Sequence, residues 1–97
     1  RLKKFVALDT SNPPGKNYRQ AIKMLIPWCK EVGFKISEIP IPQKIVKGRV
    51  NLLAEKRNKN KPRLLIYSHL DVVPADLDWQ PFKPIIKKGK IYARGIS

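Results

Sequence analysis

The chain has 97 residues, of which 42% are hydrophobic, 21 are Lys or Arg and 7 are Asp or Glu, so its formal net charge is +14. This length suits one small domain or a piece of a larger one, and the apolar fraction is high enough for a core, which excludes wholesale disorder. No apolar run approaches the ~20 residues of a membrane-spanning helix, and the first residues do not resemble a secretory signal. The single cysteine excludes an internal disulfide. We therefore expect a cytoplasmic protein with no membrane partner.

The positive charge favours one class of partner, a polyanion such as a nucleic acid. Basic residues are scattered over nearly every segment, and only residues 56–63 form a denser patch. No aromatic side chain interleaves this patch, as a platform for stacking bases would need. A basic nucleic-acid-binding module is therefore the alternative function, to be weighed against a simple lysine-rich, solvated surface.

Two helices are expected in the first third of the chain. Apolar residues at helical spacing over residues 1–9 indicate the end of one helix, which two prolines and a glycine then stop. A second helix is expected from Asn17, as its N-cap, to Gly33, which ends it in the left-handed conformation. Pro27 should kink this helix, and Cys29 lies in its apolar stripe, which favours a small packing residue over a reactive thiol.

The rest of the chain predicts strands. Residues 34–41 suit an edge strand because prolines stand at their end, and residues 50–55 suit a second strand. Residues 63–71 are apolar on both faces, which is typical of a central strand covered by helices. Residues 84–93 predict a hairpin around Lys88-Gly89. The expected fold is therefore α/β, with helices packed on a mixed β-sheet.

The only histidine, His69, stands two residues before Asp71, at the end of the apolar run. Side chains alternate along a strand, so both residues would project from one face. An imidazole beside a carboxylate suits a metal site, in which the histidine binds the metal and the carboxylate fixes its tautomer. The same pair also occurs as a purely structural hydrogen bond, and the spacing leaves both possibilities open. A single imidazole cannot hold zinc tightly, and the sequence shows no second histidine and no Glu-Glu pair.

Five segments of the chain form an ordered set of motifs. They are Asp9-Thr10-Ser11-Asn12-Pro13-Pro14-Gly15, Gly48-Arg49-Val50-Asn51-Leu52, Ser68-His69-Leu70-Asp71-Val72-Val73-Pro74, Trp79 with Pro81-Phe82, and Gly89-Lys90-Ile91-Tyr92-Ala93-Arg94-Gly95. Together they resemble the N-terminal part of the zinc-dependent family that includes acetylornithine deacetylase, succinyl-diaminopimelate desuccinylase, aminoacylase and glutamate carboxypeptidase. The resemblance covers almost the whole chain. It implies that residues 1–97 are an incomplete N-terminal segment of a zinc-exopeptidase-like catalytic domain, without the family's lid or dimerisation domain.

The resemblance implies roles for two residues. His69 matches the family's first zinc-ligand histidine, and Asp71 matches the catalytic aspartate that orients this histidine. The complete family site holds two zinc ions, of which this chain would supply one matching ligand. In the family an aspartate that bridges the two ions follows an Arg-Gly-x-x stretch, which here is Arg94-Gly95-Ile96-Ser97 at the end of the sequence. The family's later Glu-Glu pair and remaining ligands have no counterpart in these residues.

The function that the resemblance implies is zinc-dependent hydrolysis of N-acyl amino acids or small peptides, as in a deacetylase, desuccinylase or carboxypeptidase. The 97 residues alone are expected to be inactive and to bind zinc poorly, and the full-length parent is compatible with a homodimer. Arg94 is either a contact for a substrate carboxylate or a surface cation. Trp79 and Phe82 are expected to be packing residues.

Overall fold

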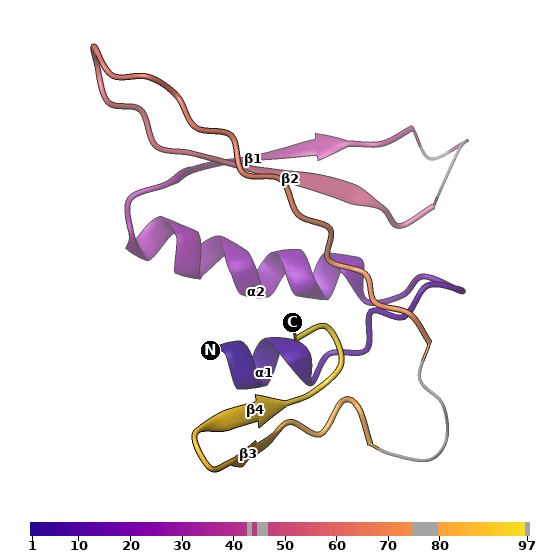
Figure 1. Cartoon of the computed structure of the whole chain (residues 1–97). Helices are drawn as coiled ribbons and strands as arrows, with labels where there is room; N and C mark the ends of the chain where they lie inside the picture. The colour runs from indigo at the N-terminus through magenta and orange to yellow at the C-terminus, as the bar shows by residue number, and fades with distance from the viewer. Residues whose placement is uncertain (43, 45–46, 75–79, 97) are drawn as a thin grey trace.

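The computed structural model describes residues 1–42, 44, 47–74 and 80–96 (Figure 1). Its elements are α1 (Leu2–Val6), α2 (Tyr18–Glu31), β1 (Lys35–Pro40), β2 (Val50–Glu55), β3 (Ile85–Lys87) and β4 (Lys90–Tyr92). The combination of helices and strands agrees with the predicted α/β class. The predicted mixed sheet is wrong for the described residues, because their strands form two separate antiparallel pairs, β1 with β2 and β3 with β4.

Helix α2 ends for the reason that the sequence predicts. Gly33 has a φ of +87°, and its N–H donates to the carbonyl of Lys30 at 3.0 Å, while the N–H of Phe34 donates to the carbonyl of Cys29 at 3.0 Å. This pair of bonds is a Schellman motif, which satisfies carbonyl groups that the helix leaves open. Pro27 lies inside α2, and the helix continues beyond it to Glu31.

The start of α2 differs from the expected cap. Asn17 does precede the helix, but its backbone is left-handed, with a φ of 61°, and its side chain makes no capping hydrogen bond. The Asn17 amide instead donates to the backbone carbonyl of Asp9 at 2.8 Å. This bond ties the loop after α1 to the start of α2.

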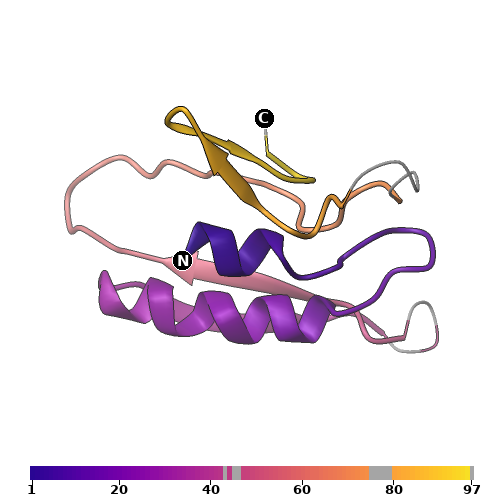
Figure 2. The same cartoon turned by 90° about the horizontal axis from the view of Figure 1, so that it is seen from below.

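Figure 1 shows the order in which the elements stack, and Figure 2 shows the same elements from below, with α1 and α2 running side by side in front of β2. Helix α2 packs on the β1–β2 sheet, α1 lies on the other side of α2, and the β3–β4 hairpin follows beyond α1 (Figure 1). Between the helices, the rings of Phe5 and Trp28 meet edge to face with centroids 6.3 Å apart. The predicted hairpin is confirmed, and it turns at Lys88 and Gly89, whose φ angles of 50° and 72° are those of a type I′ turn.

The predicted central strand over residues 63–71 is wrong: this segment has no strand structure. Its apolar residues Leu64, Leu65, Ile66 and Tyr67 are 82–88% exposed. An apolar run shows which surface a segment tends to bury, but a strand also needs a neighbour for its N–H and C=O groups. Among the described residues, neither a sheet nor a helix covers this run.

The described chain is open for its length. Its buried hydrophobic residues are Val6, Ala21 and Ile22, and its radius of gyration is 15.6 Å, against about 13 Å for a compact chain of 100 residues. Among the residues that the structure describes, no helix has the length and apolar character needed to cross a membrane.

A candidate metal centre at His69

Residues 70–72, although not in a strand, are fixed to the loop that follows α1. The hydroxyl of Thr10 donates to the carbonyl of Leu70 at 2.9 Å, and the N–H of Val72 donates to the carbonyl of Thr10 at 3.2 Å. The N–H of Asn12 donates back to the carbonyl of Val72 at 2.8 Å, and Ser11 forms an isolated parallel bridge with Val72. Thr10 and Ser11 are only 5% and 6% exposed. This buried clamp positions the polar residues on either side of Leu70.

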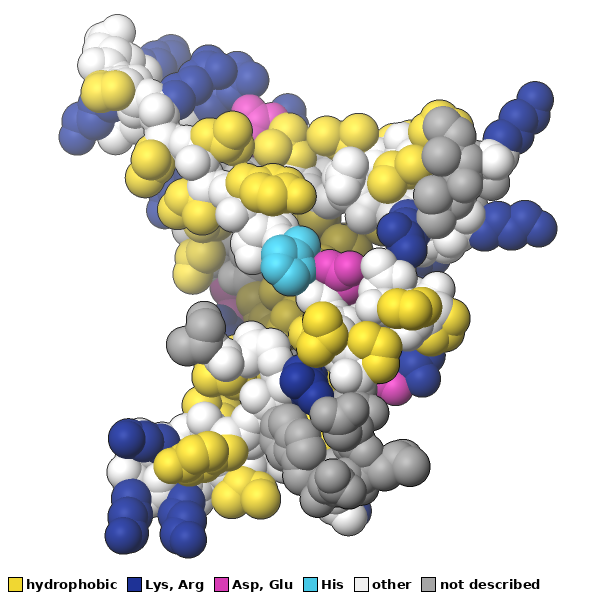
Figure 3. Space-filling view, turned by 45° about the vertical axis from the view of Figure 1, so that its right-hand side comes forward, with side chains coloured by type: hydrophobic (Ala, Val, Ile, Leu, Met, Phe, Trp, Pro, Cys, Tyr) yellow, Lys and Arg dark blue, Asp and Glu magenta, His cyan; other side chains and the backbone are white. Residues whose placement is uncertain are grey.

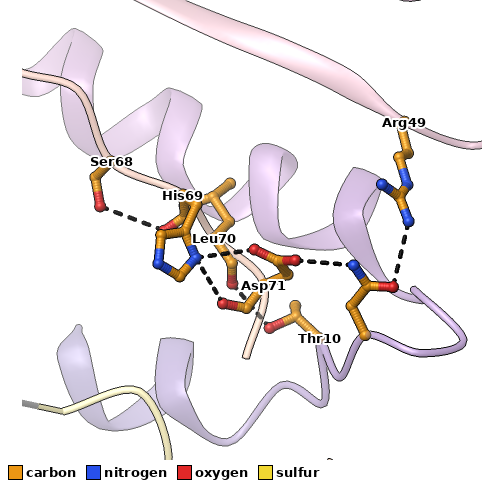
Figure 4. A network of polar contacts seen from close by, with 7 residues as sticks. Thr10, Arg49, Ser68, His69, Leu70 and Asp71 are labelled. Atoms are coloured by element: carbon orange, nitrogen blue, oxygen red, sulfur yellow. Dashed lines mark hydrogen bonds and ion pairs between the residues drawn. The ribbon is translucent and has the colours of Figure 1, made fainter. Parts of the chain in front are cut away.

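The side chains of His69 and Asp71 lie against each other at the clamped segment (Figure 4). Nδ1 of His69 is 2.9 Å from Oδ1 of Asp71 and 2.9 Å from the backbone carbonyl oxygen of Asp71. Both partners are acceptors, so Nδ1 carries the hydrogen, and in the neutral ring Nε2 then keeps a lone pair. A neutral imidazole in this tautomer is the form that binds a metal through Nε2.

The second carboxylate oxygen of Asp71 is also engaged. The side-chain amide of Asn12 donates to Oδ2 of Asp71 at 3.0 Å, and Oδ1 of Asn12 accepts a hydrogen bond from the guanidinium of Arg49 at 3.3 Å. The hydrogen bond from Asn12, followed by the one from His69, lowers the pKa of Asp71 against a smaller opposing effect of burial. The carboxylate is thus held as an anion between two donors.

A hollow of about 520 Å³ opens beside this pair. It is lined by His69 and Asp71, by apolar side chains of the α1 region such as Leu2 and Phe5, and by Arg94. Figure 3 shows the histidine on the surface, next to an acidic side chain and beside a recess with hydrophobic walls. The exposed imidazole therefore faces a space in which a ligand can approach it.

The donor set fits one corner of a zinc site. The His69 ring, oriented through Nδ1 by a carboxylate, is the arrangement that zinc-bound histidines have. Among the residues that the structure describes, no group of three or more His, Cys, Asp or Glu side chains is placed to share a metal ion. The described residues would therefore supply one oriented ligand, and the three that a catalytic zinc needs are not gathered here.

Sequence reasoning missed two members of this network, Asn12 and Arg49. Both stand in motifs that carry the family resemblance, but no chemistry was assigned to them, since their contacts join residues 37 to 59 positions apart. Of the other predicted residues, Phe82 and Arg94 line the hollow. Trp79 lies outside the described residues.

Comparisons with known proteins agree with the resemblance. The sequence model of Peptidase family M20/M25/M40 matches residues 65–97, which include His69 and Asp71. Succinyl-diaminopimelate desuccinylase of Sulfurovum sp. (strain NBC37-1) is 50% identical over 50 residues, which are 50% of this chain and 14% of the relative. Acetylornithine deacetylase of Photorhabdus laumondii is 33% identical over 95% of this chain and 22% of its own length.

A third relative, succinyl-diaminopimelate desuccinylase of Helicobacter pylori (strain P12), is 33% identical over 95% of this chain and 26% of its own length. The chain thus spans between a seventh and about a quarter of the curated relatives it matches. No solved structure gives a significant match. The family match and the relatives confirm the resemblance of this chain to the N-terminal part of Peptidase family M20/M25/M40.

Proposed function

We propose that the protein carrying this chain is a metal-dependent amide hydrolase of the deacetylase or desuccinylase type, and that His69 is one of its zinc ligands. The observation that carries the proposal is the hydrogen bond of 2.9 Å between Nδ1 of His69 and Oδ1 of Asp71, which leaves Nε2 available. The family match and the names of the relatives support the class of reaction.

The residues of this chain would prepare the site rather than complete it. His69 offers Nε2 to the metal, and Asp71 keeps the ring in the required tautomer and orientation. When bound, zinc supplies Lewis-acid activation of water and of an amide carbonyl. The apolar wall of the hollow would limit the water around a bound substrate. The proposed substrates are small N-acyl amino acids or peptides, and the proposed localisation is cytoplasmic.

The alternative, a nucleic-acid-binding module, gains little from the geometry of the basic patch at residues 56–63. Lys56 donates to the carbonyl of Val32 at 2.9 Å, so its ammonium group binds the C-cap residue of α2. Arg57 is paired with Glu55 at 3.3 Å. Two of the basic residues are thus engaged within the fold, and the hydrolase remains the better-supported proposal.

Hydrolysis of N-acetyl and N-succinyl amino acids by the protein at its full natural length tests the proposal. We expect turnover that a chelator removes and zinc restores, and that His69→Gln abolishes. The control is Lys61→Gln in the basic patch, which should leave turnover unchanged. Salt-sensitive binding of nucleic acid that is lost in Lys61→Gln, with no turnover of any amide, would favour the alternative instead.

A further inference from the structure

A continuous chain of hydrogen bonds leads from Arg49 to the candidate metal ligand (Figure 4). The guanidinium of Arg49 donates to Oδ1 of Asn12 at 3.3 Å, and Nδ2 of Asn12 donates to Oδ2 of Asp71 at 3.0 Å. Oδ1 of Asp71 then accepts from Nδ1 of His69 at 2.9 Å. The four residues come from the loop after α1, the residue just before β2 and the clamped segment, so only the folded chain assembles them.

The direction of every bond in this chain is fixed by its two ends. A guanidinium can only donate and an ionised carboxylate can only accept. The amide of Asn12 must therefore present its oxygen to Arg49 and its nitrogen to Asp71. The opposite orientation would set two donors against each other at one end and two acceptors at the other. Arg49 thus fixes the orientation of the Asn12 amide, and the amide in turn fixes the orientation of the Asp71 carboxylate.

The backbone of Asn12 and the guanidinium of Arg49 are themselves held in place by other contacts. The backbone N–H of Asn12 donates to the carbonyl of Val72 at 2.8 Å, as part of the buried clamp. The guanidinium of Arg49 lies over the ring of Tyr18, with 5.5 Å from its carbon to the ring centroid. A Cβ atom added at Gly15 would lie 3.1 Å from the Arg49 guanidinium and 2.9 Å from the Tyr18 hydroxyl, so the glycine makes room for this stack.

We propose that Asn12 and Arg49 are positioning residues that hold the Asp71 carboxylate in the orientation in which it binds Nδ1–H of His69 and leaves Nε2 for the metal. Asp71 needs such support because its side chain is 36% exposed and its segment belongs to no helix or strand. The inference deepens the proposed function and rests on it, since both concern the same site.

The first test measures the zinc dissociation constant of the full-length protein and its variants by competition with a chelator. Asn12→Leu removes both side-chain bonds at similar size, and Asn12→Asp keeps the acceptor for Arg49 but sets an acceptor against Asp71. We expect zinc affinity to fall by about 10- to 100-fold in each, as for other outer partners of metal ligands. Arg49→Met should cause a smaller loss, and Asn58→Leu on the exposed turn should cause none.

The second test needs neither zinc nor activity. The metal-free protein is labelled with ¹⁵N-histidine, and the His69 signals are assigned by their loss in His69→Gln. We expect the Nδ1–H tautomer in the unchanged protein and a mixture with Nε2–H in Asn12→Leu and Asn12→Asp. A folded Asn12→Asp protein, judged by its circular dichroism and melting, that keeps both the tautomer and the zinc affinity would overturn the inference. Should Asn12→Leu fail to fold, Asn12→Asp and Arg49→Met still decide it.

The proposed function and the positioning role fail in different ways. If His69→Gln loses zinc while the Asn12 and Arg49 variants bind it normally, only the positioning role is wrong. If His69→Gln binds zinc as well as the unchanged protein, the proposed function is wrong and the positioning role toward the metal falls with it.

Discussion

The hydroxyl of Thr10 donates a hydrogen bond of 2.9 Å to the backbone carbonyl of Leu70, sixty residues further along the chain. Leu70 separates His69 from Asp71, so this bond fixes the backbone between the two residues of the candidate metal centre. The segment lacks the ladder of a sheet. The Thr10 side chain, from a loop distant in sequence, thus supplies the hydrogen bond that a neighbouring strand would donate to this carbonyl in a sheet.

Replacing Thr10 should show how much of the local structure depends on this bond. Thr10→Val keeps the shape but leaves the Leu70 carbonyl without its donor, and we expect the free energy of unfolding to fall by about 1–3 kcal/mol. Thr10→Ser keeps the hydroxyl and serves as the control, with a smaller loss. Urea unfolding measures both, and equal effects of valine and serine would show that the hydroxyl contributes nothing.

Asp71→Asn should weaken metal binding without displacing the side chain. The amide has the size of the carboxylate but lacks its charge, and it can turn a donor toward Nδ1 of His69. We therefore expect zinc affinity to fall by about 10- to 100-fold. The measurement is a chelator competition with Glu38→Gln, on the exposed edge of β1, as the matched control. Unchanged affinity in Asp71→Asn would show that the carboxylate does not orient the ligand.

Gly33 should be sensitive to any side chain that resists the left-handed conformation. Its φ is +87°, and a Cβ atom there would make ordinary contacts of 3.7 Å with the Lys56 side chain, so space is not the obstacle. We expect Gly33→Ala to lower the free energy of unfolding by about 1–2 kcal/mol, the cost of this backbone conformation. Gly33→Asn should cost less, because asparagine tolerates it better. A chemical denaturation series in which alanine costs no more than asparagine would contradict this explanation.

Asp9 should make the stability depend on acid pH. Burial raises its pKa, but hydrogen bonds from Lys16 and Ser11 outweigh burial and lower the pKa below its ordinary value. The carboxylate therefore stabilises the fold fully above its unfolded pKa of about 3.9, and this contribution is lost as the pH falls through the lower, folded value. We expect the stability difference between the unchanged protein and Asp9→Asn to shrink below about pH 4. A difference that stays constant from pH 6 to pH 3 would refute it.

Local signals in the sequence predicted local structure well. The glycine at the end of α2 and the Lys88-Gly89 turn were predicted because each needs a positive φ, a property of one or two residues. Strand β2 was predicted from its alternation over Val50–Glu55. The N-cap position at Asn17 was predicted correctly, but the side chain makes no capping hydrogen bond, and its amide nitrogen donates to the Asp9 carbonyl eight residues earlier.

Features that depend on distant partners were harder to predict. The apolar composition of residues 63–71 indicated a central strand, but the described residues place no neighbouring strand along it. The adjacency of His69 and Asp71 was predicted from their spacing, whereas the contact of Asp71 with Asn12 joins residues 59 apart. Only the folded chain reveals that the loop after α1 reaches the site.

The most direct test of the metal centre is a crystal structure of the zinc-loaded, full-length protein with anomalous data at the zinc edge. We expect a zinc peak about 2.0–2.1 Å from Nε2 of His69, with Nδ1 still bound to the Asp71 carboxylate. A zinc ion bound to Nδ1, or zinc held by the protein away from His69, would contradict it.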